Sequence, residues 1–282
     1  MWQVCKRLLW ISRPISWPNT AYPFAIGYLV AGGGFDLLWL IGTLYFLIPY
    51  NLLLYGVNDV FDYESDILNP RKGGIEGMRE QRAFHPTIMW AALVTNVPFL
   101  GYFLFTVDTA ASLTFLGVIF MVIAYSMAHL RFKERPFLDS ITSSSHFVGP
   151  LVFALSIQGF PDVAWPYVIA FFLWGMASHA FGAIQDIIPD RAGSIASIAT
   201  VLGARKTVWF SLFCYVAAVG IISAQGWPAL AVGIVGLSYC INVAIFMHVT
   251  DLTSARTNVG WRRFLWLNYV TGFVVSIVLL LT

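Results

Sequence analysis

Apolar segments of about 20 residues recur along this chain, and that is the length a helix needs to cross a bilayer. Of the 282 residues, 59% are hydrophobic and 11% are charged, against about 25% charged in soluble domains. We therefore expect an all-α integral membrane protein that folds as one domain over residues 1–282. Nine segments are long and apolar enough to span, near residues 16–34, 38–59, 85–106, 109–127, 138–158, 164–185, 206–224, 228–249 and 263–281.

The basic residues give this expected bundle an orientation. All 16 Lys and Arg residues lie at the N-terminus or in every second connection between the segments. Because positively charged loops stay on the cytoplasmic side, we expect a multi-pass protein of the cell (plasma) membrane with its N-terminus and these loops in the cytoplasm. The formal net charge is only +2, and nothing in its distribution suggests binding to nucleic acid.

The stretch NDVFDYESD, residues 58–66, places several acids at the end of the second apolar segment. If the segment continues as a helix, Asp59, Asp62 and Asp66 share one face, whereas Glu64 lies off that face. Like charges on one face repel, and a divalent cation relieves that repulsion. Mg²⁺ prefers a few hard oxygen ligands and leaves its other positions to water or substrate phosphates.

A second acidic cluster, QDIIPDRAGS, follows the sixth segment. Asp186 and Asp190 are four residues apart, with Arg191 beside them, and Pro189 is expected to end or kink the helix there. Two carboxylate clusters on one side of the membrane suggest two metal ions bridged by a ligand with several phosphates, such as diphosphate. The alternative for either cluster alone is a set of solvated loop charges.

Basic residues after the fourth segment are candidate partners for such phosphates. In YSMAHLRFKERP, Arg131 can bind phosphate oxygens in a bidentate manner and Lys133 can bind them as a point charge. The alternative is contact with anionic lipid headgroups. For Arg135 that lipid contact is the preferred interpretation.

These residues resemble the UbiA superfamily of intramembrane prenyltransferases. The family's first motif, NDxxDxxxD, is matched by Asn58, Asp59, Asp62 and Asp66, and its second, DxxxD, by Asp186 and Asp190. Further similarities are Arg71 after the first motif, the basic loop with Tyr125, Arg131 and Lys133, and Asn19 in the first segment, preceded by Arg13 and Pro14.

The resemblance implies nine transmembrane helices around a central cavity and transfer of a prenyl group from a Mg²⁺-bound prenyl diphosphate to a lipophilic acceptor. It implies that the metal is held by Asp59, Asp62, Asp66, Asp186 and Asp190. It implies that the diphosphate is bound by Asn19, Asn58, Arg71, Arg131, Lys133 and Arg191. The catalytic residues that we expect are Asp59, Asp62, Asp186, Lys133 and Tyr125, and stabilisation of the departing diphosphate would be their main task.

Aromatic and histidine side chains are weaker candidates. The rings of Tyr125 and Phe181 could shield a carbocation, although most aromatic residues in a membrane bundle serve packing. The reaction that the resemblance implies ends with loss of a proton, and His129, His146, His179 and His248 are candidates for the base. For buried histidines among serines, hydrogen bonding between helices is the competing explanation.

The acceptor is not selected by the motifs, which concern the diphosphate. Residues 11–29 and 58–77 resemble bacterial lycopene elongases, which implies dimethylallyl diphosphate as donor and lycopene as acceptor. Another lipophilic acceptor, such as a quinone precursor, an aromatic compound or a tetrapyrrole, is the alternative. A membrane transporter is less favoured, because transporters place ionisable residues near the bilayer midplane, and the aspartate motif of CDP-alcohol phosphotransferases is absent from the sequence.

Overall fold

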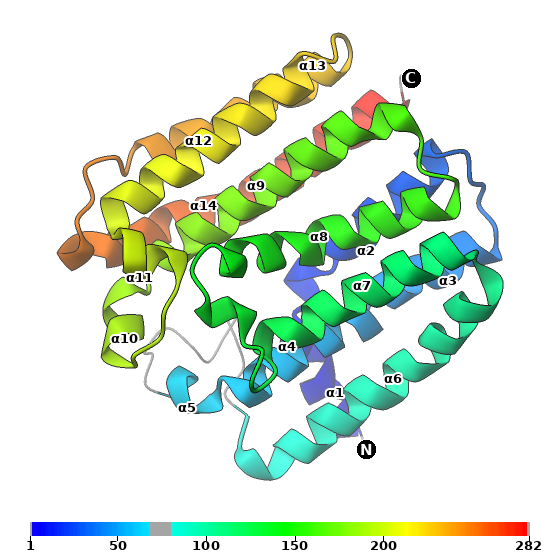
Figure 1. Ribbon diagram of the computed structural model, residues 1–282, viewed down its shortest axis with the longest axis horizontal. Helices are drawn as coiled ribbons and strands as arrows, with labels where there is room; N and C mark the ends of the chain where they lie inside the picture. The colour runs from blue at the N-terminus through cyan, green and yellow to red at the C-terminus, as the bar shows by residue number, and fades with distance from the viewer. Residues whose placement is uncertain (1, 68–79, 281–282) are drawn as a thin grey trace. The chain divides into compact units, whose positions relative to one another are not determined.

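The computed structural model describes residues 2–67 and 80–280, and all regular elements in those ranges are helical (Figure 1). The chain divides into two compact units. Unit 1 comprises Met1–Phe132 and Ser145–Asp162, and unit 2 comprises Lys133–Ser144 and Val163–Thr282. The all-α expectation is confirmed, and folding as one domain over residues 1–282 stays a prediction.

Unit 1 contains the N-terminal helices and most of α8. Its elements are α1 (Trp2–Ile11), η1 (Pro14–Ser16), α2 (Pro18–Val30), α3 (Leu37–Leu47), α4 (Pro49–Phe61), α5 (Tyr63–Asp66), η2 (Arg82–Phe84), α6 (His85–Thr106), α7 (Thr109–Ser126) and the later turns of α8 (Leu138–Ile157), where η denotes a short 3₁₀ helix.

Unit 2 contains the first turns of α8 and the C-terminal helices. Its other elements are α9 (Trp165–Ile184), α10 (Ile187–Ala192), α11 (Ile198–Leu202), α12 (Ala204–Ser223), α13 (Ala229–Ala244), η5 (Asp251–Thr257) and α14 (Asn258–Leu280), while η3 (Phe132–Glu134) and η4 (Asp162–Ala164) lie at the unit boundaries. Short α10 and α11 follow one end of the long helix α9 (Figure 1).

Seven helical stretches in the described part of the chain are long and apolar enough to cross a membrane. They are Leu37–Phe61, Arg82–Thr106, Thr109–Ser126, Leu138–Ile157, Asp162–Ile184, Ala204–Ser223 and Asp251–Leu279. They correspond to seven of the nine predicted segments. The other two segments contain the shorter helices α2, with 13 residues, and α13, with 16 residues. The chain is therefore a multi-pass membrane protein, and the exact count of nine crossings stays a prediction.

The span Leu37–Phe61 is interrupted between α3 and α4 at Ile48. Pro49 follows this break, and proline has no N–H to continue the helical ladder. The side-chain amide of Asn51 donates to the carbonyl oxygens of Phe46 at 2.8 Å and Leu47 at 3.0 Å, and to Thr20 Oγ1 at 2.7 Å. Asn51 thus supplies donors where the helix is irregular, as apolar surroundings require.

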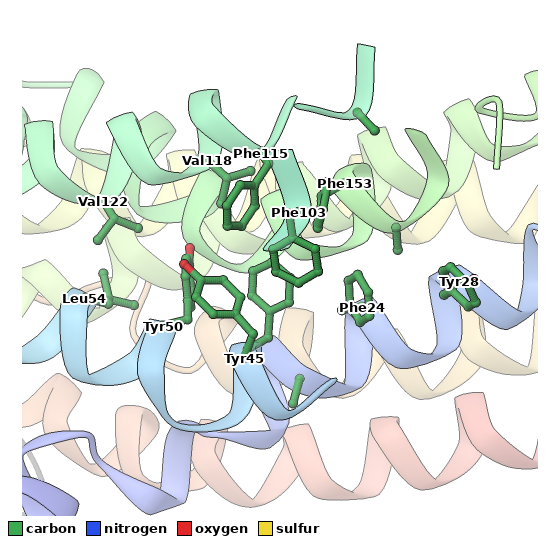
Figure 2. Packing of buried hydrophobic residues seen from close by; sticks show 14 residues of the cluster. Phe24, Tyr28, Tyr45, Tyr50, Leu54, Phe103, Phe115, Val118, Val122 and Phe153 are labelled. Atoms are coloured by element: carbon green, nitrogen blue, oxygen red, sulfur yellow. The ribbon is translucent and has the colours of Figure 1, made fainter. Parts of the chain in front are cut away.

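A cluster of buried aromatic rings forms the core of unit 1. Figure 2 shows Tyr45, Phe103, Phe115 and Phe153 gathered together, and ring centroids lie 4.9 Å apart for both the Phe103–Phe115 and the Phe115–Phe153 pair. Edge-to-face and tilted contacts of this kind add to the stabilisation from burial. Tyr50, also in the cluster, donates its hydroxyl to the His146 carbonyl oxygen at 2.9 Å. The core therefore joins α3 and α4 to α6, α7 and the later turns of α8.

The core of unit 2 lies along α9 and the helices that follow it. Phe181, Tyr215, Tyr239 and Phe264 are buried in this cluster. At Gly175, α9 comes so close to the first turns of α8 that a Cβ atom would lie 2.3 Å from Ser144 Oγ. The absence of a side chain at Gly175 thus permits close packing of these two helices.

Candidate functional site

The first acidic motif lies where α4 ends. Asp62 donates its N–H to the Asn58 carbonyl at 2.9 Å, and Asp66 donates to the Asp62 carbonyl at 2.8 Å, so the helical pattern continues from α4 into α5. The predicted sharing of one face by Asp59, Asp62 and Asp66 follows from this geometry. Glu64, off that face, is exposed and pairs with Arg82.

Arg13 forms an ion pair with the first aspartate of the motif. Its Nη2 lies 2.6 Å from Asp59 Oδ1, and their side chains are 15% and 2% exposed. Its guanidinium also lies over the Tyr55 ring, 4.3 Å from the centroid. Burial lowers the pKa of Arg13, but Asp59 and Tyr55 raise it, and the net pKa is above the ordinary value. The sequence predicted no partner for Arg13, only its position before the first apolar segment.

Arg131 approaches the second aspartate of the motif. Its Nη2 lies 3.7 Å from Asp62 Oδ1, and Nη1 donates to the Phe61 carbonyl at 3.5 Å. Asn58 accepts a hydrogen bond on its side-chain oxygen from Ser126 Oγ at 2.8 Å. The structure thus brings predicted residues from the first motif and the basic loop together in unit 1, and Ser126 is a neighbour that the sequence did not indicate.

The remaining candidates of the N-terminal half have varied surroundings. Tyr125 packs its ring edge-to-face with His146, with centroids 5.0 Å apart. Asn19 is half-buried in the first turn of α2, and Lys133 is half-buried in η3. Arg71 lies outside the described residues.

The second acidic motif begins directly after α9, in unit 2. Asp186 precedes the first residue of α10, and Asp190 within that helix donates its N–H to the Asp186 carbonyl at 2.9 Å. Pro189 lies in the first turn of α10, where a missing N–H is tolerated. Both aspartates are half-buried. A helix end at this motif is confirmed, but it falls at Ile184, before Pro189, which lies within the next helix.

Arg191 is held by groups of unit 2 other than the motif aspartates. Its guanidinium donates to Asp251 Oδ2 at 2.6 Å and to the Thr200 carbonyl at 2.7 Å. Asp251 Oδ1 in turn accepts from the Ala204 N–H at 2.7 Å. Diphosphate binding by Arg191 therefore requires these contacts to rearrange, and it stays a prediction.

The donor set of the two motifs fits a divalent metal by its chemistry. All five predicted ligands are aspartates, which provide the hard oxygen donors that Mg²⁺ prefers. In residues 2–67 and 80–280, no three His, Cys, Asp or Glu side chains are arranged closely enough to hold a metal ion. Arginines compensate the charges of Asp59 and Asp62 in this conformation. These ion pairs would have to open for a metal to bind there.

Long apolar helices with clusters of carboxylates and arginines at their ends define a multi-pass membrane protein. The chain belongs to the UbiA prenyltransferase family, whose model matches residues 20–274. It is therefore a membrane prenyltransferase, and the resemblance seen in the two motifs is confirmed at the level of the family.

Similar proteins are named for carotenoid synthesis. The chain is 46% identical to a lycopene elongase/hydratase of Corynebacterium glutamicum over 99% of this chain and 98% of that protein. It is 52% identical to the C(50) beta-cyclic carotenoids biosynthesis protein LbtBC of Dietzia sp. over 97% of this chain, and it covers 64% of LbtBC. A lycopene elongase/hydratase of Haloarcula japonica is 32% identical over 86% of this chain and 85% of its own length.

Solved structures share the fold at low sequence identity. A UbiA homolog from Aeropyrum pernix, 18% identical, has a TM-score of 0.68 over 95% of this chain and 98% of its own. A UbiA homolog from Archaeoglobus fulgidus, bound to DMAPP and Mg²⁺ and also 18% identical, has a TM-score of 0.63 over 96% and 99%. These similarities establish the UbiA fold for this chain.

Proposed function

We propose that this prenyltransferase uses Mg²⁺ to transfer a dimethylallyl group from dimethylallyl diphosphate (DMAPP) to lycopene in carotenoid biosynthesis. The observation that carries the proposal is the 46% identity, over nearly the whole of both chains, to a protein named lycopene elongase/hydratase. The donor is supported by the similarly folded UbiA homolog bound to DMAPP and Mg²⁺.

The aspartates of each motif would hold the metal: Asp59, Asp62 and Asp66 in the first, Asp186 and Asp190 in the second. Mg²⁺, when bound, neutralises charge on the diphosphate and so favours its departure. Asp59 is buried against Arg13, so binding of a cation there would release that guanidinium. Because a guanidinium keeps its positive charge, the released Arg13 side chain would bind another anion, and a phosphate oxygen of the diphosphate is suitable.

Cationic and amide side chains would bind the diphosphate itself. Arg131 and Lys133 would donate to its oxygens, with Arg71, Arg191, Asn19 and Asn58 as further ligands. Support comes from Arg131, which already reaches into the first motif at Asp62. Donors placed in advance of the reaction stabilise the charge that develops as the carbon–oxygen bond breaks. Stabilisation of the departing diphosphate would therefore be the catalytic role of Asp59, Asp62, Asp186 and Lys133.

Tyr125 would act on the other product of ionisation, the allylic cation. An aromatic face attracts a cation and excludes water from it. The Tyr125 ring packs edge-to-face against His146, which favours this orientation of the ring. The ring could then stabilise the cation without a bond to it.

An acceptor as apolar as lycopene would enter from the bilayer, so the only polar substrate is the diphosphate. The positive-inside pattern supports a cell (plasma) membrane location with the N-terminus and the acidic motifs on the cytoplasmic side. A soluble donor would then reach the motifs directly.

The proposal is tested by incubating membranes containing the protein with Mg²⁺, DMAPP and lycopene, and by measuring products with mass spectrometry. We expect lycopene with one or two added C5 units, with or without water. Chelation of divalent ions, Asp59→Asn and Asp186→Asn should each lower the rate by about 100-fold or more. Glu64→Gln, an equally small change in an exposed residue of the first motif, is the matched control and should leave the rate unchanged.

Two outcomes would contradict different parts of the proposal. Turnover of a quinone precursor or an aromatic acceptor, with lycopene unreactive, would refute lycopene as acceptor. Activity that persists after chelation, or in both aspartate variants, would refute the metal-dependent mechanism.

A further inference from the structure

Unit 2 contains a buried polar group that the binding of metal and diphosphate does not use. Asp139 and Ser140 in the first turn of α8 are both fully buried. Ser140 Oγ lies 3.1 Å from His179 Nδ1 on α9 and 3.4 Å from Asp139 Oδ1. A carboxylate, a hydroxyl and an imidazole therefore follow one another across the α8–α9 contact.

The carboxylate at the end of this row is firmly placed. Asp139 Oδ1 accepts the Ser140 N–H at 2.7 Å, and Oδ2 accepts the Ile198 N–H at 2.7 Å, at the start of α11. These two backbone donors hold the carboxyl group of Asp139 in place beside Ser140. A carboxylate in this position faces the His179 ring through the Ser140 hydroxyl and would compensate a positive charge on that ring.

The group of Asp139, Ser140 and His179 lies toward the end of α9 that the second motif follows. His179 is five residues before Ile184, the last residue of α9, and Asp186 is two residues beyond it. The close contact of Gly175 with Ser144 lies one turn before His179 on α9 and one turn after Ser140 on α8. The row thus lies between the tightly packed part of these helices and the end that carries Asp186.

From this placement we infer that His179 is the general base that removes the proton at the end of prenyl transfer, and that Ser140 and Asp139 are its positioning residues. The inference rests on the proposed function. If Ser140 Oγ donates to Asp139, it accepts from Nδ1–H of His179, and the lone pair of His179 is then on Nε2.

The reaction balances without another reagent. The acceptor double bond attacks C1 of the donor, the C1–O bond breaks, and diphosphate leaves with the electron pair. The resulting tertiary cation loses a proton from the neighbouring carbon to Nε2, and a double bond forms. Where water adds instead, the oxonium that forms loses its proton to Nε2. Asp139 stabilises the imidazolium in both cases.

The test uses the full-length protein in membranes with Mg²⁺, DMAPP and lycopene. His179→Gln retains a hydrogen-bonding group but cannot take up a proton. We expect its rate of product formation to fall by about 100-fold, while its affinity for radiolabelled DMAPP in the presence of Mg²⁺ stays that of the unchanged protein. Added imidazole should restore part of the rate in His179→Ala. Exposed His248, also in unit 2, provides the matched control His248→Gln, which should be unchanged.

Ser140→Ala separates positioning from folding. We expect a lower kcat and an unchanged KM for DMAPP, together with an altered ratio of hydrated to unhydrated product. A purely structural role would instead reduce the amount of folded protein and leave the rate per folded molecule and the product ratio unaltered.

Other results would overturn the inference. A normal rate and product ratio in His179→Gln would exclude His179 as the base, and so would equal loss in His179→Ala with and without imidazole when DMAPP still binds. If the unchanged protein makes no lycopene product at all, the proposed function fails instead, so the two failures are distinguishable.

Discussion

Arg13 and Asp59 form a buried ion pair, and the energetics of such pairs depend strongly on whether both partners are present. Each charge loses hydration on burial, and the attraction between the two charges offsets that cost. Because Arg13 Nε has no hydrogen-bond partner among the described residues, the Asp59 contact and the Tyr55 ring are the main contacts of this guanidinium that the structure records. Asp59 is thus both a candidate metal ligand and a structural counter-charge.

We predict that Arg13→Gln destabilises the protein by about 3 kcal/mol, because it removes the cation of a buried ion pair. The double variant Arg13→Gln with Asp59→Asn should be more stable than Arg13→Gln alone. Thermal unfolding in detergent measures both. Arg82→Gln breaks the exposed pair with Glu64 and should cost about 0–1 kcal/mol. Additive losses in the double variant would contradict the prediction.

Asn51 stabilises the interruption between α3 and α4. Its amide donates to two backbone carbonyls at the break and to Thr20. We predict that Asn51→Ala destabilises the protein by about 1–3 kcal/mol, since the Leu47 carbonyl and Thr20 Oγ1 each lose this donor in an apolar environment. The Phe46 carbonyl keeps a second donor, the Thr20 hydroxyl. Thr43→Ala, which removes a hydroxyl bonded to its own helix at Trp39, is the control for polar loss in the same span. Equal melting temperatures for the two variants would show that the interruption does not depend on Asn51.

Asp36 caps α3 by accepting the Trp39 N–H at 2.8 Å, and it also accepts the Tyr28 hydroxyl at 2.8 Å. The Trp39 N–H lowers the pKa of Asp36, and the Tyr28 hydroxyl adds to this. A carboxyl whose pKa is lowered on folding stabilises the protein above its unfolded pKa, and that contribution is lost as the pH falls through the folded pKa.

We predict that Asp36→Ala lowers stability at neutral pH by about 1 kcal/mol and that its melting temperature falls less than that of the unchanged protein as the pH is lowered below about 4. Tyr28→Phe, which keeps the cap and removes one hydrogen bond, should give an intermediate loss. Parallel pH profiles for the unchanged protein and Asp36→Ala would refute the assignment.

Helix bounds were largely predictable from composition, whereas contacts between helices were not. The segments at 85–106 and 138–158 correspond to α6 and α8 within one residue, because long apolar windows have sharp polar ends. The segment at 228–249 is longer than α13, which ends at Ala244 before a series of turns. Hydropathy averages over such turns. The pairings of Arg13 with Asp59 and of Arg191 with Asp251 join residues more than 40 positions apart, and a single sequence holds no signal for them.

Cysteine labelling can test the orientation of the protein in the membrane. Cys5 in α1 is exposed, whereas Cys214 and Cys240 are buried. We predict that a membrane-impermeant maleimide leaves Cys5 unlabelled in intact cells and labels it after permeabilisation, because the distribution of basic residues predicts a cytoplasmic N-terminus.

Val163→Cys in a Cys5→Ser background provides the opposite case. Val163 is 77% exposed and lies in a connection predicted to face outward, so this cysteine should be labelled in intact cells. Labelling of Cys5 in intact cells would contradict this topology and indicate an N-terminus outside the cell.

The ion pair between Arg13 and Asp59 also bears on how the protein is made. A buried carboxylate that depended on Mg²⁺ for its counter-charge would tie insertion into the membrane to the supply of the ion. Here the chain provides that counter-charge itself. Folding around Asp59 therefore does not depend on a bound metal ion, and under the proposed function Mg²⁺ is needed only for turnover.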